Sequence, residues 1–243
     1  MTKHRLNQRS QFATRWLALA TVATLASSAD ALEVDGKLLV GAYRVPAESA
    51  SARRSYYWEL ENGVKEVARS RIDAPRELAV VLLGDNASEN GKRFEVEFYG
   101  GSLLPSTIVV RKGSTLRINN KDEIAHEVYA KGLKAFGPET ISPRAIRSIE
   151  LKEAGSWQLY DRLVTHVRGQ LHVLANLVAI AKVNPDGEYS FSDVEPGNYT
   201  LRVYHGAKLL VEKPVEVVKR DNRKKEIAIK LDPITLTNSS KPE

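Results

Sequence analysis

The sequence predicts an all-β protein built mainly from two packed β-sandwiches. Two observations predict this class. Short runs of alternating or continuous apolar residues recur along most of the chain, as strands require. Clusters of Gly, Pro, Asn and Asp separate these runs at intervals of roughly 8–12 residues, which is typical of β-sandwiches.

The N-terminus has the pattern of a secretory signal peptide. A basic stretch up to Arg15 precedes an apolar run, Trp16 to Ala26, and Ala29-Asp30-Ala31 supplies small residues ahead of a cut before Leu32. The apolar run is shorter than the ~20 residues that span a bilayer, and no other stretch could cross one. We therefore expect residues 1–31 to be removed, and the protein to be periplasmic.

Composition narrows the chemistry that the chain can support. It contains no cysteine, which excludes disulfides, thiolate metal sites and a cysteine nucleophile. The net charge is +6, but without residues 1–31 the chain has 32 basic and 29 acidic residues, or +3. These charges are interspersed, so we expect no nucleic-acid partner.

The first region after the leader spans residues 32–94, and its strands either complete a sandwich or form a small β-domain. Leu32–Tyr43 and Leu78–Leu83 are expected strands, the second continuously apolar as in a buried strand. Pro46–Arg54 is an expected loop, and Tyr56–Ala68 fits either a strand with a turn or a short helix.

The middle region, residues 95–175, is expected to form one domain. Its expected strands are Phe94–Tyr99, Ser106–Arg111, Ser114–Asn119, His126–Ala130, Arg147–Lys152, Trp157–Tyr160 and Gln170–Leu174. Residues 130–147 contain glycines and prolines with little periodicity, which predicts a long loop.

The third region, residues 176–232, is expected to form a smaller β-domain, and residues 233–243 a flexible tail. Its expected strands are Leu177–Val183, Glu188–Phe191, Tyr199–Val203, Leu209–Val218 and Glu226–Leu231. Polar turns at Asn184–Gly187 and Glu195–Asn198 separate the first of them.

The middle region resembles the cupredoxin family. The matching residues are Val110, Gly113, Ser114, Thr115, Leu116, Ile118, Asn120, Asp122 and His126, followed by Gly155, Trp157 and Leu159. The resemblance implies a Greek-key β-sandwich and a copper site in which His126 is the first histidine ligand. Blue copper also needs a thiolate, which this chain cannot supply.

The third region resembles the transthyretin-like or carboxypeptidase-regulatory β-domain. The residues that carry this likeness are Gly187, Tyr189, Phe191, Asp193, Val194, Pro196, Gly197, Tyr199, Leu201 and Val203. The order of the two domains is similar to that of exported bacterial proteins of the plastocyanin or methylamine-utilization type.

Two alignments of the copper site are open. The preferred one anchors on Val167-Arg168-Gly169 and puts Asp161, Val164 and Val167 in the positions of the cysteine, the second histidine and the methionine, so that no cofactor is bound. The second anchors on Asp161 and His166 and puts Gln170 near the axial position. His126, Asp161, His166 and Gln170 would then form an N/O site for copper, without a thiolate.

Other candidate residues have simpler structural interpretations. His172 alternates with apolar neighbours and is expected to face outward, and His205-Gly206 is expected in a hairpin turn. Asp122 and Glu123 are neighbouring acids on a turn, which solvation explains better than catalysis. Tyr56, Tyr57 and Trp58 form an aromatic cluster that fits packing, or stacking on a sugar.

These features favour a protein that is not an enzyme: an exported binding or assembly module on a cupredoxin-like scaffold, with another periplasmic or envelope protein as its partner. The first alternative is a copper-binding protein in copper handling or electron transfer, which needs the second alignment. The other alternative is a cell-envelope or carbohydrate-binding protein, which depends on exposed aromatic side chains.

Overall fold

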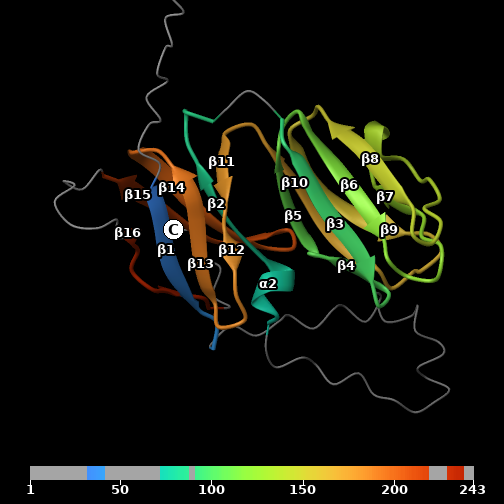
Figure 1. The fold of residues 1–243 in the computed structure, drawn as a ribbon, viewed down its shortest axis with the longest axis horizontal. Coiled ribbons are helices and arrows are strands. Elements are labelled where there is room, and N and C mark those ends of the chain that lie inside the picture. Colours follow the sequence, from blue (N-terminus) through green and yellow to red (C-terminus); the bar gives the residue numbers. More distant parts are fainter. Residues whose placement is uncertain (1–31, 42–71, 88–90, 219–228, 238–243) are drawn as a thin grey trace, which may run out of the picture.

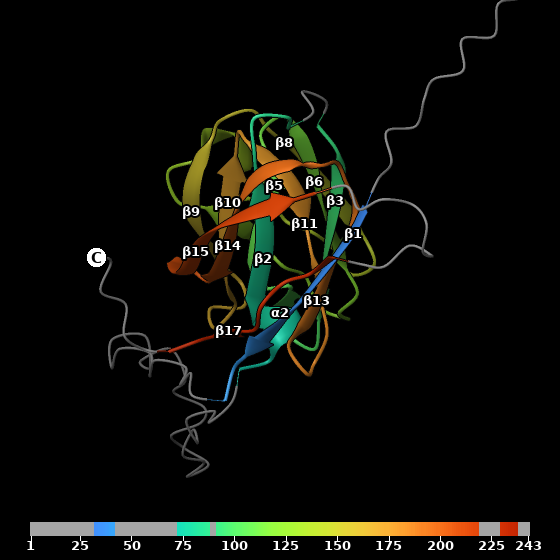
Figure 2. The same cartoon turned by 90° about the vertical axis from the view of Figure 1, so that its left-hand side faces the viewer.

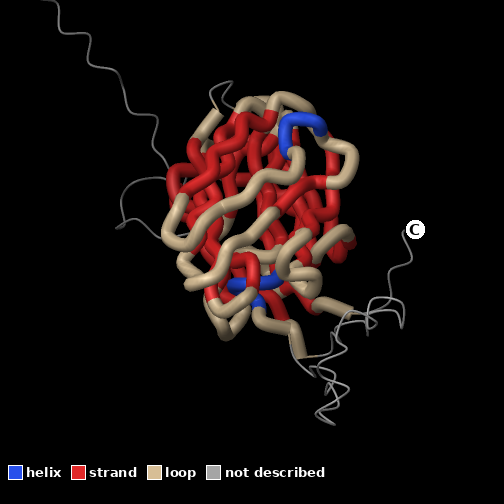
Figure 3. Tube along the Cα trace, turned by 90° about the vertical axis from the view of Figure 1, so that its right-hand side faces the viewer, coloured by secondary structure: helices blue, strands red, loops and turns tan. Residues whose placement is uncertain are grey.

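The computed structural model describes residues 32–41, 72–87, 91–218 and 229–237, which form two β-sandwiches packed side by side (Figure 1). The all-β prediction is confirmed: the described helices are single turns, α2 (Ala74–Glu77) and η2 (Lys134–Phe136) (Figure 3). No described helix is long and apolar enough to span a membrane. The expected signal peptide, the segment Tyr56–Ala68 and its aromatic cluster lie outside the described residues.

One sandwich, which we call the inserted sandwich, consists of β3 to β10. One of its sheets has the order β4-β3-β6-β8 and the other β5-β10-β9-β7. The bounds are β3 (Arg93–Tyr99), β4 (Ser102–Leu104), β5 (Thr107–Arg111), β6 (Ser114–Asn120), β7 (Val128–Ala130), β8 (Ile146–Leu151), β9 (Gly155–Asp161) and β10 (Arg168–Leu174). Alternate residues of both sheets face a common core that includes Phe98, Leu116, Ile118 and Leu171, each fully buried.

The other sandwich, which we call the split sandwich, combines strands from both ends of the described chain (Figure 2). One sheet has the order β12-β13-β1-β16, with β17 also pairing with β1, and the other has the order β11-β2-β14-β15. The bounds are β1 (Leu32–Leu39), β2 (Leu78–Leu83), β11 (Leu177–Ile180), β12 (Lys182–Val183), β13 (Glu188–Val194), β14 (Gly197–His205), β15 (Lys208–Val217), β16 (Ile229–Lys230) and β17 (Ile234–Thr235).

These pairings correct the expected role of residues 32–94, which were expected to complete the first sandwich or to form a domain of their own. Instead, β1 pairs with β13, while β2 lies between β11 and β14. The inserted sandwich therefore interrupts the split sandwich between β2 and β11. Sequence order could not reveal this, because strand pairing brings together residues more than 90 positions apart.

The sequence of β2, LAVVLL, is continuously apolar because both faces of this strand are buried. Leu78, Val80 and Leu82 face the core of the split sandwich. Ala79, Val81 and Leu83 face a smaller cluster between the sandwiches, together with Val109 of β5 and Tyr204 of β14. A strand between two cores has no solvent face, so it shows no polar alternation.

Polar contacts reinforce this seam between the sandwiches. The Arg111 guanidinium donates to the carbonyls of Leu177 and Val178, at 2.7 and 3.1 Å. The Gly206 amide donates to the Thr107 hydroxyl at 2.8 Å, and His172 Nε2 lies 2.7 Å from the Gly206 carbonyl oxygen. His172 does leave its own sheet outward, as expected, but the β14–β15 turn covers it and leaves only 4% of it exposed.

The core of the split sandwich contains one buried hydroxyl without a partner. Tyr189 Oη has no hydrogen bond within the described part of the chain, and burial raises the pKa of Tyr189 to about 12. The ring tip lies against Gly36, where an added Cβ would come within 2.3 Å of the hydroxyl oxygen. Glycine is therefore required opposite this tyrosine.

We expect Tyr189→Phe to stabilise the protein by about 1 kcal/mol, because it removes an unsatisfied buried polar group without leaving a cavity. The matched control is Tyr199→Phe. The Tyr199 hydroxyl accepts from Asn86 Nδ2 at 2.8 Å and donates to the Glu195 carbonyl at 2.7 Å. That control is expected to lower stability by about 1 kcal/mol. Urea denaturation of both variants tests this, and equal losses of stability would contradict it.

We expect acid to weaken the folded state through His172. Burial lowers the pKa of His172, and the hydrogen bond to the Gly206 carbonyl offsets this only in part. The unfolded chain then binds the proton more readily, so the stability due to this residue is lost as the pH falls below the ordinary histidine pKa of 6.5. Urea denaturation at about pH 7.5 and about pH 5.5 should show a smaller drop for His172→Gln than for the wild type. An equal drop in the two proteins excludes this role.

Candidate functional site

His126 lies at one end of the inserted sandwich, in a site that is closed to solvent. Its backbone forms an isolated bridge with Ile141, and its side chain is 0% exposed. The imidazole stacks on Phe98, with ring centroids 3.9 Å apart and planes 3° from parallel. Strand β7 begins only at Val128, two residues after the expected start, because His126 pairs with the loop that contains Ile141.

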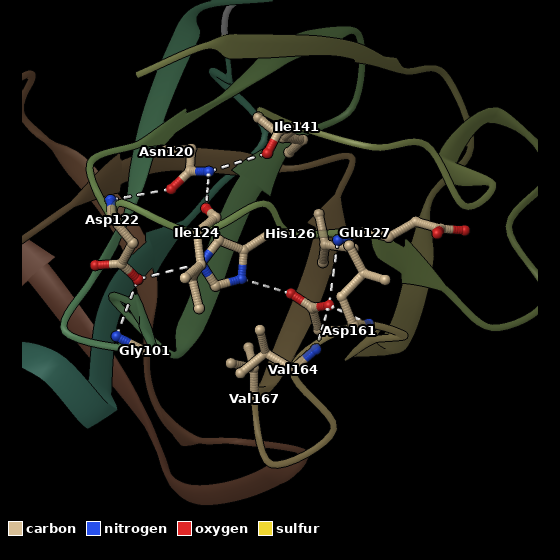
Figure 4. A network of polar contacts seen from close by, with 12 residues as sticks. Gly101, Asn120, Asp122, Ile124, His126, Glu127, Ile141, Asp161, Val164 and Val167 are labelled. Atoms are coloured by element: carbon tan, nitrogen blue, oxygen red, sulfur yellow. Dashed lines mark hydrogen bonds and ion pairs between the residues drawn. The ribbon is translucent and has the colours of Figure 1, made fainter. Parts of the chain in front are cut away.

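Both ring nitrogens of His126 face carboxylates (Figure 4). Nδ1 lies 2.7 Å from Asp161 Oδ2, and Nε2 lies 3.1 Å from Asp122 Oδ2. An ionised carboxylate only accepts hydrogen bonds, so both contacts are satisfied when both ring nitrogens carry hydrogen. We call Asp122, His126 and Asp161 the Asp–His–Asp network.

Asp161 ends β9 and fixes the loop that follows it. Its Oδ1 accepts hydrogen bonds from the backbone amides of Glu127, Leu163 and Val164, at 3.1, 2.9 and 3.0 Å. Together with His126, these donors occupy both oxygens of a side chain that is 0% exposed. Asp161 therefore joins the 162–167 loop to the segment that carries His126.

Asp122 holds a second loop in the same way. The consecutive amides of Gly100 and Gly101 donate to its two oxygens, at 2.6 and 2.9 Å. Both glycines have positive φ, 61° and 70°, which lets two successive N–H groups point at one carboxylate. Asn120 orients this turn, since its Oδ1 accepts from the Asp122 amide at 3.0 Å and its Nδ2 donates to the Ile124 carbonyl at 2.8 Å.

The structure brings together only two of the four expected metal ligands. His126 and Asp161 are in contact, whereas His166 Nε2 lies 3.1 Å from the Gly101 carbonyl oxygen and Gln170 donates to Ser156 Oγ at 2.7 Å. Across the described ranges, no three His, Asp or Glu side chains are grouped to hold a metal ion. The structure therefore does not assemble the four expected ligands into one site.

The remaining positions of the preferred alignment are apolar. Val164 is partly buried and Val167 is buried, and both pack against the core of the inserted sandwich. The Val167 amide donates to the Val164 carbonyl at 3.0 Å, which closes the turn next to Asp161 (Figure 4). These two side chains add bulk beside the network but no metal donor.

Sequence reasoning missed the role of Asp122, which was expected in a solvated turn. Its side chain is only 11% exposed, and it completes the network. Two features of the sequence pointed to a structural role for Asp122: the Asn120-Lys121-Asp122 turn and the Gly100-Gly101 pair. Nothing in the sequence indicated that these segments, about 20 residues apart, face each other.

The three loops that the network joins present apolar side chains to solvent. Tyr99 is 60% exposed, Ile124 50% and Leu163 54%. Each lies within two residues of a network residue or of the Gly100–Gly101 pair that holds Asp122. Two ion pairs lie beside these side chains, Glu123 with Arg144 at 2.9 Å and Glu127 with Arg162 at 2.8 Å.

No protein-family model matches this sequence, and no curated protein matches it. Among solved structures, amicyanin from Paracoccus versutus is 20% identical, over 37% of this chain and 85% of that chain, with a TM-score of 0.30. A copper-containing nitrite reductase from Thermus scotoductus is 15% identical, over 35% of this chain and 23% of that chain, with a TM-score of 0.32. Likenesses this partial carry no argument about function.

We expect Asp161→Ala to lower stability by about 3–5 kcal/mol, because it leaves a buried imidazole and three amides without their acceptor. The matched control is Glu123→Gln, which breaks an ion pair whose two side chains are about four-fifths exposed. Such exposed pairs contribute little, so the control should unfold at the wild-type urea concentration. Similar midpoints for Asp161→Ala and the wild type would rule out a structural role for the network.

Proposed function

We propose that the protein is an exported, non-catalytic binding protein of the cell envelope, and that it recognises a partner protein with the loops around the Asp–His–Asp network. The scaffold is a cupredoxin-like sandwich without a blue-copper centre, carried by a transthyretin-like split sandwich. The observation that carries the proposal is the occupation of both His126 nitrogens by carboxylates, next to loops with half-exposed apolar side chains.

The sequence supports the scaffold and the location. The residues that resemble cupredoxins fall on β5, β6 and β9 and on the turn that precedes β7. Those that resemble transthyretin-like domains fall on β13 and β14 and the turns beside them. Export is proposed from the leader pattern of residues 1–31.

The chemistry of the network supports binding rather than catalysis. His126 contacts two carboxylates and the ring of Phe98, rather than a hydroxyl or thiol that it could deprotonate. His126 is also fully buried, so a substrate in the solvent could not reach its ring. What the network does supply is rigidity in three neighbouring loops, and loops ordered before binding lose less entropy when a partner docks.

The proposed surface consists of Tyr99, Ile124 and Leu163. Aromatic and large aliphatic side chains of this kind provide most of the energy at protein interfaces when a rim of polar groups surrounds them. The ion pairs Glu123–Arg144 and Glu127–Arg162 supply such a rim.

Site-specific photocrosslinking in the exporting cell tests the proposal. A photoreactive residue at Ile124 or Leu163 should trap one defined protein, whereas the same residue at Leu209, 39% exposed on the split sandwich, should not. With the trapped protein purified, Leu163→Glu should raise the dissociation constant about 10-fold or more, and Leu209→Glu should leave it unchanged.

Two results would reject the proposal. One is unchanged affinity in Ile124→Glu and Leu163→Glu variants whose circular dichroism matches the wild type. The other is copper that remains on the exported chain after desalting, with an electron paramagnetic resonance signal that His126→Ala abolishes. The second result would establish the metal-binding alternative.

A further inference from the structure

The outer face of the β12-β13-β1-β16 sheet contains a hollow of about 570 Å³, in the sandwich that does not carry the Asp–His–Asp network. This volume is within the range of small-molecule sites. The neighbouring inward residues Val34 and Phe191 are fully buried, so the alternate side chains of β1 and β13 point outward into it.

One row of neighbouring residues on this face crosses all four strands of the sheet. Strand register places Lys182, Ser190, Asp35 and Lys230 side by side on β12, β13, β1 and β16. With strands about 4.8 Å apart, the two lysine positions at the ends of the row are separated by about 14 Å. A carboxylate and a hydroxyl therefore lie between two ammonium groups.

Some charged side chains of this hollow form ion pairs with one another, and others do not. Lys37 pairs with Glu188 at 3.4 Å, and Asn184 Nδ2 also donates to Glu188, at 3.2 Å. By contrast, within the described part of the chain no hydrogen bond or ion pair engages the side chains of Asp35, Lys182 or Lys230, although register places Lys230 directly beside Asp35. The row therefore offers its charges to a ligand.

We propose that this hollow binds short zwitterionic peptides that contain an acidic residue. The row requires a ligand with one cationic group opposite Asp35 and an anionic group toward each lysine. The α-ammonium, the α-carboxylate and one side-chain carboxylate of such a peptide supply this set. A zwitterionic lipid headgroup has only one anion for two lysines, and a polyanion would meet Asp35, Glu33 and Glu188 in the same hollow.

The test is a nuclear magnetic resonance titration of the exported, isotope-labelled chain with the dipeptide Ala-Glu. Saturable shifts are expected at the amides of Asp35 and Ser190. N-acetyl-Ala-Glu, which lacks the ammonium, should bind about 10-fold more weakly or not at all, because charged hydrogen bonds are the strongest contacts available. Ala-Gln amide, which lacks both carboxylates, should behave in the same way.

Variants locate the contacts. Asp35→Asn and the double variant Lys182→Gln/Lys230→Gln should each weaken Ala-Glu binding about 10-fold. Lys213→Gln, on β15 in the opposite sheet, is the matched control and should leave binding unchanged. Well-dispersed amide spectra of every variant show that the fold is intact.

Three outcomes overturn the proposal. They are shifts that do not saturate by about 10 mM, a weak limit for recognition, equal binding of the acetylated dipeptide, and equal binding by Asp35→Asn. Vesicles of phosphatidylethanolamine provide the lipid comparison. Broadening of the β1 and β13 amides by these vesicles, without saturable Ala-Glu shifts, would assign the hollow to a lipid headgroup instead.

Discussion

The contact between His126 and its two carboxylates is the interaction on which one end of the inserted sandwich depends. A fully buried imidazole flanked by Asp122 and Asp161 is tolerable only because every polar atom has a partner. Through Asp122 and Asp161 the network also holds the Gly100–Gly101 turn and the 162–167 loop, so the same contacts fix three segments. The surface that these loops present is then a consequence of a buried electrostatic arrangement.

Hydrogen bonds and apolar packing act together at this end of the inserted sandwich. Asp161 accepts four hydrogen bonds there, and Val164 and Val167 contribute apolar bulk. Three backbone amides donate to Oδ1 of Asp161, and His126 Nδ1 contacts Oδ2. Hydrogen bonds to one carboxylate therefore order the 162–167 loop and the segment that carries His126.

A second constraint acts between the sandwiches. Strand β2 is buried on both faces, and the seam beside it is closed by Arg111, Thr107 and His172. Because the chain enters and leaves the inserted sandwich beside this seam, at Gly84 and Asn176, the two connections are joined by a backbone hydrogen bond of 3.0 Å. The insertion is thus anchored at its base by both apolar and polar contacts.

Most strands of the described chain could be predicted from the sequence, because alternation and turn residues are local signals. β2, β6 and β8 lie within one residue of the expected runs, and the loop expected at 130–147 is present except for the short turn at η2. The long-range pairing of β1 and β2 could not be predicted, since a strand's pattern records that it is buried but not against which partner. Alternation likewise predicted that His172 faces away from the core of its own sandwich. It could not predict that the β14–β15 turn would bury this side chain.

The sequence by itself predicted the all-β class, excluded thiolate chemistry in this chain, and placed His126 and Asp161 in one candidate site. Only the tertiary structure decided that Asp122 joins them while His166 and Gln170 do not. The physical reason is that hydrogen-bond partners are selected by distance and direction in space. The same holds for the charged row of the split sandwich, whose four residues come from four strands between positions 35 and 230.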